Sequence, residues 1–210
     1  MRIFLRFLFF VIGILVFSYG ISMAIKVQYL GIHPWDVLNI ALFDKWGLTI
    51  GTWNLIVGGV LISGTLFLNR KYVRIGTILN GLMVGPLVDL YLFWDILPQR
   101  SSLYLDAIIL ILAIIIMGIG GGLYSASGLG TGPRDGFMLS LSELTGQSIS
   151  KVRIAFESSI LIIGWLLGGP IFIFTFIYTF IQSPIFQFSF LHFTKLLDSY
   201  SASRSNNFNL

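Results

Sequence analysis

The chain has 210 residues, of which 56% are hydrophobic and 10% are charged, and its mean hydropathy is +0.89. A soluble domain carries roughly 25% charged residues, so this composition excludes a soluble globular protein and indicates an integral membrane protein. The net charge of +4 comes from basic residues scattered at the ends of apolar runs, unlike a nucleic-acid patch, and the absence of cysteine excludes disulfides and thiol chemistry.

Six apolar segments reach the length of about 20 residues that a membrane helix needs. In chain order they are 7–25, 50–68, 75–97, 104–123, 149–168 and 171–193. The first follows a basic N-terminus but is not followed by a clean signal-peptide cleavage site, so we expect it to be retained. Short turns join the second segment to the third and the fifth to the sixth. We expect the polar tail 199–210 to fray.

The chain contains two copies of one pattern. Leu30-Gly31-x-x-Pro34-x-Asp36 reappears 99 positions later as Leu129-Gly130-x-x-Pro133-x-Asp135. A further match, shifted by one residue, pairs Pro86 with Pro184. A fixed period of this length predicts two copies of one structural unit.

Each copy holds three expected spans, at about 7–97 and 104–193, within a single membrane domain that covers 1–198. Lys and Arg favour the cytoplasmic side; with the N-terminus inside, ten of the 13 basic residues lie there. We therefore expect both termini in the cytoplasm. Because three is odd, the second copy must be inverted relative to the first. The predicted fold is an all-α membrane protein with six transmembrane helices in two inverted three-helix repeats, as in many secondary transporters.

The long loop of each copy predicts a short helix that starts at the proline of the motif. Proline suits the first helical turn, where its missing N–H costs nothing, and Gly47 and Gly146 are the expected stops. One interpretation is an interfacial helix whose proline and aspartate are only start signals. The other is a re-entrant half-helix whose N-terminus points into a cavity and meets a polar or anionic ligand. The candidate residues of this loop motif are Gly31, Pro34, Gly130 and Pro133.

Charged residues inside the expected spans are candidate site residues, because a charge in hydrocarbon needs a partner, a proton or water. Glu157 lies in the fifth span, and Arg153 precedes it by four residues, so a salt bridge is available. That pair is either structural or a site for a proton or a cationic group. Asp89 follows Pro86 at a point that matches Pro184, where paired interruptions indicate a central site or a packing kink. The candidate ligand set is Asp36, Asp89, Arg134, Asp135, Arg153 and Glu157.

Catalytic signatures are missing, since His33 and His192 stand alone and no hydrolase, zinc or nucleotide motif occurs. We therefore expect neither an enzyme nor a bound cofactor or metal. The expected partners are the lipid bilayer and an unknown small molecule or ion, and not nucleic acid. Pairs of glycines four residues apart favour close helix packing within the monomer, with a homodimer as the alternative.

The segments Gly128–Gly136 (GLGTGPRDG), Val152–Glu157 and Gly164–Gly169 resemble the YczE/YyaS/YitT family of bacterial membrane proteins. Gly31–Leu38 and Gly47–Thr52 fit the same family, and the resemblance covers roughly 20–190. It implies a multi-pass protein of the bacterial cytoplasmic membrane, from a Gram-positive species, and supplies little mechanism. His33 stands where related sequences tend to have a small residue.

Three functions fit these observations. The first is a small-molecule or ion transporter whose site lies between the inverted repeats. The second is a membrane partner or regulator that transports nothing and binds a protein or lipid. The third is the ligand-capturing membrane subunit of a larger importer, which need not contain an inverted repeat.

Overall fold

The structure is a computed structural model that describes residues 2–48, 50–94 and 102–206. Within these ranges the chain forms eight α-helices, two short 3-10 turns and no strand. The all-α class predicted from the sequence is therefore confirmed. The elements are α1 (Arg2–Lys26), η1 (Gln28–Leu30), α2 (Pro34–Trp46), α3 (Ile50–Leu68), η2 (Arg70–Tyr72), α4 (Ile75–Phe93), α5 (Leu103–Ala126), α6 (Pro133–Thr145), α7 (Ile149–Leu166) and α8 (Ile173–Asn206).

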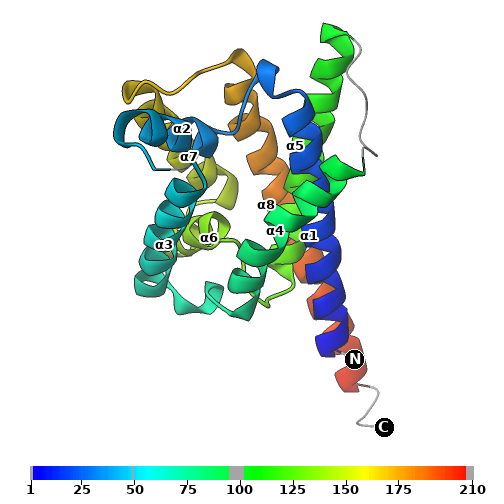
Figure 1. The fold of residues 1–210 in the computed structure, drawn as a ribbon. Coiled ribbons are helices and arrows are strands. Elements are labelled where there is room, and N and C mark those ends of the chain that lie inside the picture. The colour runs from blue at the N-terminus through cyan, green and yellow to red at the C-terminus, as the bar shows by residue number, and fades with distance from the viewer. Residues whose placement is uncertain (1, 49, 95–101, 207–210) are drawn as a thin grey trace.

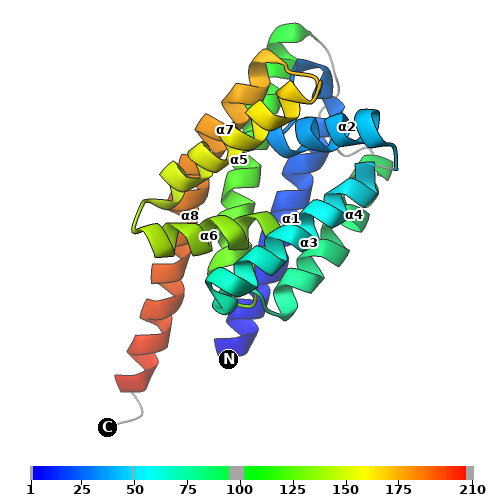
Figure 2. The same ribbon diagram turned by 90° about the vertical axis from the view of Figure 1, so that its left-hand side faces the viewer.

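Three long helices, α1, α5 and α8, form the central packing unit (Figures 1 and 2). Val27, Leu110, Ala113 and Ile114 are fully buried in its core, where dispersion contacts and exclusion from water stabilise the packing. α4 packs against α1 from the other side. The helices α2, α3, α6 and α7 form a second group beside this unit, in which α2 packs on α7 and α6 packs on α3.

The second half of the chain repeats the element order of the first. α2 and α6 each contain 13 residues and begin 99 positions apart, at Pro34 and Pro133. α4 and α8 begin 98 positions apart, at Ile75 and Ile173. In the view of Figure 1, α1 and α4 run upward whereas α5 and α8 run downward, and α3 runs downward whereas α7 runs upward. Helices at equivalent positions in the two halves therefore run in opposite directions.

Four of the described helices are long and apolar enough to cross a membrane, rather than the six expected. These are α1, α4, α5 and α8. α3 has 19 residues and is apolar along its length, with Thr52–Leu68 as a shorter apolar helical stretch. α7 carries Lys151, Arg153 and Glu157 within 18 residues, which lowers its hydropathy below that of a simple span.

The ends of the helices differ in part from the expected ones. Both short helices begin at their proline and end before Gly47 and Gly146, as predicted, and Gly146 has the left-handed conformation of a helix stop (φ +67°). We expected the polar tail to fray from residue 199, but α8 continues past the apolar segment to Asn206. α4 ends at Phe93, and the expected end of this span at residue 97 lies outside the described residues.

Candidate functional site

The glycine of each loop motif places the loop against the last helix of the other half. A Cβ atom at Gly130 would lie 2.5 Å from the backbone nitrogen of Thr77 in α4, and its φ of +144° favours glycine. A Cβ atom at Gly31 would lie 2.9 Å from the backbone nitrogen of Thr175 in α8. This close approach explains why both loops carry glycine, and it positions the short helices α2 and α6 that follow.

Four side chains from α5, α6 and α7 form one buried cluster, which we call the charge cluster: Tyr124, Asp135, Arg153 and Glu157. The Tyr124 hydroxyl donates a hydrogen bond to Oδ2 of Asp135. Arg153 donates from Nη1 to Oδ1 of Asp135 at 2.5 Å and from Nη2 to Oε1 of Glu157 at 3.2 Å. The side chains of Arg153 and Glu157 keep only 3% and 0% of their exposure, so water screens these ion pairs little.

The charge cluster is closed by α8. The ring of Phe186 packs against the Arg153 guanidinium, with 4.2 Å between Cζ and the ring centroid, which favours the charged form of the arginine. Oε2 of Glu157 and Nε of Arg153 are buried without a hydrogen bond to any described residue. In native proteins, buried polar atoms of this kind mark a bound water, an ion or a functional role.

A second polar group lies on the neighbouring face of α6. Arg134 donates from Nη2 to Oδ1 of Asn54 in α3 at 2.5 Å, and its guanidinium stands 4.9 Å from the ring centroid of Trp35 in α2. Asp36 of α2 is exposed, and its charge interacts with that of Arg134. Asn54 is exposed as well. Solvent therefore reaches the polar groups beside α2 and α3 but not the charge cluster.

The structure brings together part of the predicted candidate set. Asp135, Arg153 and Glu157 are in direct contact, and the salt bridge expected between Arg153 and Glu157 is present. Arg134 lies beside Asp135 on α6 but points to α2 and α3. Asp89 is exposed on α4 and takes no part in the contacts of the charge cluster.

Sequence analysis missed three members of this region: Tyr124, Asn54 and Phe186. Tyr124 stands directly after the expected span 104–123, and a tyrosine deep in a helical bundle needs a partner for its hydroxyl. The need for such a partner marks Tyr124 as a candidate polar residue from the sequence, although it does not identify Asp135 as the partner. Asn54 occupies in the first copy the position of Arg153, so the repeat itself pointed to it.

Surface pockets lie away from the charge cluster. One of about 460 Å³ is apolar and lined by α1, α4 and Leu129. The other, of about 420 Å³, lies between α7 and α8 and includes His192 and Lys195. In the part of the chain that the structure describes, no group of three or more His, Cys, Asp or Glu side chains could hold a metal ion. The four residues of the charge cluster are all buried, so the cluster is covered in this conformation.

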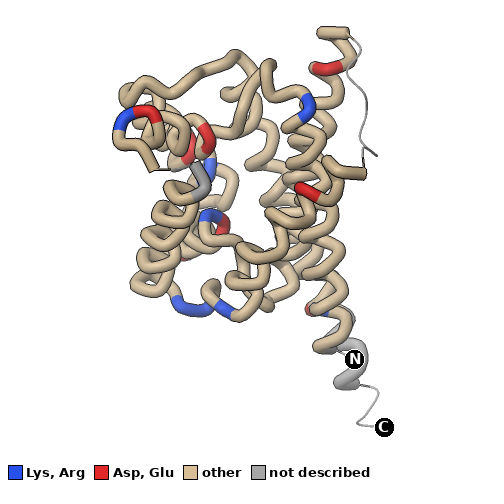
Figure 3. The backbone as a smooth tube through the Cα atoms, viewed as in Figure 1, with Lys and Arg blue, Asp and Glu red and all other residues tan. Residues whose placement is uncertain are grey.

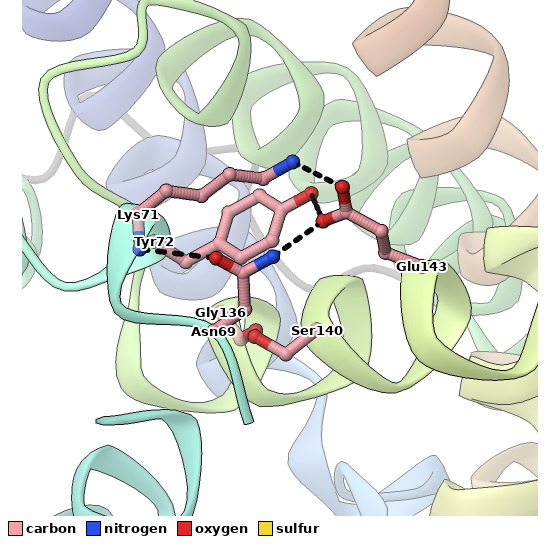
Figure 4. Close-up of polar contacts among 6 residues, drawn as sticks. All are labelled: Asn69, Lys71, Tyr72, Gly136, Ser140 and Glu143. Atoms are coloured by element: carbon pink, nitrogen blue, oxygen red, sulfur yellow. Dashed lines mark hydrogen bonds and ion pairs between the residues drawn. The ribbon is translucent and has the colours of Figure 1, made fainter. Parts of the chain in front are cut away.

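An exposed contact joins the turn between α3 and α4 to the end of α6 (Figure 4). Glu143 accepts hydrogen bonds from Nζ of Lys71 at 2.5 Å and from Nδ2 of Asn69 at 2.6 Å. The hydrogen bond from Lys71 lowers the pKa of the Glu143 carboxyl, and the same hydrogen bond raises the pKa of Lys71. Figure 3 shows that basic residues gather at this turn. The contact ties the first half of the chain to the second at the lower end of the view.

An apolar helical bundle that buries an arginine between two carboxylates defines a membrane protein with a polar centre. The chain belongs to the family of unknown function DUF6198, which matches residues 4–190. It is 35% identical over 201 residues to the uncharacterized membrane protein YczE of Bacillus subtilis, covering 96% of this chain and 93% of that protein.

Two further relatives extend the comparison. The uncharacterized protein YyaS of Bacillus subtilis is 27% identical over 80% of this chain and 83% of its own length. An uncharacterized protein of Haemophilus influenzae is 32% identical over 70% of this chain and 66% of its own length. The relationship to YczE and YyaS confirms the resemblance found in the motifs. No solved structure matches the chain.

Proposed function

We propose that the protein transports a small molecule or ion across the bacterial cytoplasmic membrane, with a site between two inverted repeats. Equivalent helices of the two halves run in opposite directions (Figure 1), which supports an inverted arrangement. The short helices pack reciprocally, α2 on α7 and α6 on α3, which supports a shared central site. Inverted repeats allow two conformations that exchange which side is open.

The observation that carries this proposal is the unequal packing of two equivalent helix pairs. α7 packs against α8, whereas α3 and α4 hardly touch. α3 and α4 are joined at the lower end in Figure 1 and diverge toward the upper end. Gly81 and Gly85 of α4 accordingly have no atom within 4 Å of the place where a Cβ would stand. Two copies of one unit that differ in this way represent the two conformations that a transporter alternates between.

The exposure of equivalent residues supports the same interpretation. Asp36 and Asn54, in the first copy, are exposed. Their counterparts Asp135 and Arg153, in the second copy, are only 8% and 3% exposed. The centre is therefore open on the side of α2, which the distribution of basic residues assigns to the outside.

Exchange of the two conformations predicts a specific contact. Gln187 of α8 accepts a hydrogen bond from the backbone N–H of Ser150, at the start of α7, at 2.6 Å. The equivalent positions in the first copy are Asp89 and Gly51. In the alternative state Asp89, which is exposed here, would reach the N-terminus of α3, where a carboxylate is favourable. This accounts for an acidic residue on an otherwise apolar face of α4.

Cysteine cross-linking tests the proposal directly, because the chain contains no native cysteine. The pair Ser150→Cys/Gln187→Cys reports the closed α7–α8 contact, and Gly51→Cys/Asp89→Cys reports the closed α3–α4 contact. In membranes treated with a short bis-maleimide, which alkylates two cysteine thiols, both pairs should cross-link. A chain that carries all four cysteines should form either cross-link but not both in one molecule.

The matched control is Phe67→Cys/Asp89→Cys. Phe67 lies 16 residues beyond Gly51, roughly 24 Å along the α3 axis, so this pair should stay uncross-linked. If the Gly51/Asp89 pair fails to react while Ser150/Gln187 reacts, or if both cross-links form together, alternating access is wrong. Once a substrate is identified, unchanged uptake or efflux in both Glu157→Gln and Asp135→Asn would refute the site assignment.

A further inference from the structure

The charge cluster contains more negative than positive groups. One guanidinium, Arg153, stands between the carboxyl groups of Asp135 and Glu157, and the exposed fractions of these three residues are 3%, 8% and 0%. If both carboxyls were ionised, the cluster would bury an unpaired negative charge in a poorly screened environment. Burial of that kind costs several kcal/mol, and a buried group escapes the cost by taking up a proton.

The geometry identifies which carboxyl carries the proton. Asp135 receives two donors, the Tyr124 hydroxyl and Arg153 at 2.5 Å, which is the pattern of an ionised carboxylate. Glu157 receives Arg153 at the longer distance of 3.2 Å, and among the described residues no group makes a well-formed hydrogen bond to its second oxygen. Glu157 is thus the less well compensated of the two.

Other charged and titratable groups around Glu157 do not supply a second counter-ion. Arg134 of α6 acts on Glu157 through its charge, but its guanidinium is bound to Asn54 and stacked on Trp35. His33 and Asp36 lie beside or on α2 and Tyr178 lies on α8, and none of them forms an ion pair with Glu157 among the described residues. The Thr179 hydroxyl of α8 also acts on Glu157 as a hydrogen-bonding group, but it is neutral and supplies no counter-charge.

We propose that Glu157 binds one proton in this conformation and releases it in the alternative one, which makes the proton the ion coupled to transport. This inference rests on the transport function proposed above. On release, the proton passes to water on the open side, and the Glu157 carboxylate completes an ion pair with Arg153. The first copy has Gly58 at this position, so one proton site serves the whole protein.

Infrared spectroscopy of the purified, reconstituted protein tests this without a known substrate. An exposed glutamate is ionised at neutral pH, so a C=O stretching band of a protonated carboxyl at pH 7 reports a buried neutral acid. We expect this band in the wild type and its loss in Glu157→Gln, an isosteric mimic of the protonated form. The control Glu143→Gln, at an exposed glutamate, should leave the band unchanged.

Two further measurements distinguish a proton that Glu157 exchanges with solvent from one that stays permanently bound. The band should shift when H₂O is replaced by D₂O, because a carried proton exchanges with solvent. It should also disappear in Asp135→Asn, where Arg153 has Glu157 as its remaining carboxylate. Absence of the band at pH 7, its survival in Glu157→Gln or Asp135→Asn, or an unshifted band in D₂O would each overturn the proposal. The cysteine cross-links test alternating access independently, so the two failures are distinguishable.

Discussion

Replacing Arg153 by methionine tests the charge cluster most severely. Methionine keeps much of the apolar packing on Phe186, which the guanidinium contacts at 4.2 Å, but removes the ion pair with Asp135 and the hydrogen bond to Glu157. Asp135 would then be an ionised carboxylate with only the Tyr124 hydroxyl as donor. Breaking a buried pair by removing one partner costs about 3–5 kcal/mol. For a protein of this size, that corresponds to a fall in melting temperature of roughly 6–20 °C.

The assay is thermal unfolding in detergent, followed by tryptophan fluorescence, with a double-mutant cycle. Arg153→Met/Asp135→Asn removes the uncompensated charge together with the arginine, so it should recover most of the lost stability. Lys71→Met, at the exposed ion pair with Glu143, is the control and should cost less than about 1 kcal/mol. If Arg153→Met behaves like Lys71→Met, or the double variant is no more stable than Arg153→Met, the buried pairing inferred here is wrong.

Three further predictions use sites outside the charge cluster. The hydrogen bond from Lys71 lowers the pKa of Glu143. The stability that the ionised Glu143 gives to the fold is therefore present above the ordinary pKa of glutamate and is lost as the pH falls through the lowered pKa. The difference in melting temperature between wild type and Glu143→Gln should therefore shrink on acidification; a growing difference would contradict this. The pKa of Lys71 is raised, so the same difference should also shrink when the pH rises through that value. Gly130→Ala should cost about 1–3 kcal/mol, because its Cβ would meet the α4 backbone at a positive φ. Gly85→Ala, in an open position within α4, should be neutral or stabilising by up to about 1 kcal/mol, and equal losses in the two variants would refute the close approach at Gly130.

What could be predicted from the sequence depended on local chemistry. The first and last residues of α2 and α6 follow from the proline and glycine at their ends, because these residues restrict the backbone regardless of distant contacts. The salt bridge between Arg153 and Glu157 follows from their spacing of one helical turn. The repeat follows from direct comparison of the two copies.

The remainder depends on contacts between segments far apart in the chain. Nothing in the spacing indicates that Tyr124 binds Asp135, or that α2 packs on α7 rather than on its neighbour in sequence. Likewise, the sequence does not decide between the two proposed conformations of the α3–α4 pair, since two states of one chain would differ in packing and not in composition. Four of the six expected spans are confirmed as long, apolar helices, and α7 differs from them because it carries three charged residues, two of which belong to the charge cluster.

The difference in charge between the two copies has a physical reason in the proposed symmetry. Trp35 and Arg134 occupy equivalent positions, 99 residues apart, and yet they contact each other, with the guanidinium 4.9 Å from the indole. An axis that relates the halves must therefore pass close to this contact. Two arginines at these positions would repel each other in a weakly screened interior, whereas an arginine and a tryptophan attract through the ring face. A polar centre on such an axis needs unlike residues at equivalent positions, and this favours one copy that carries Arg153 and Glu157 opposite a copy that keeps Asn54 and Gly58.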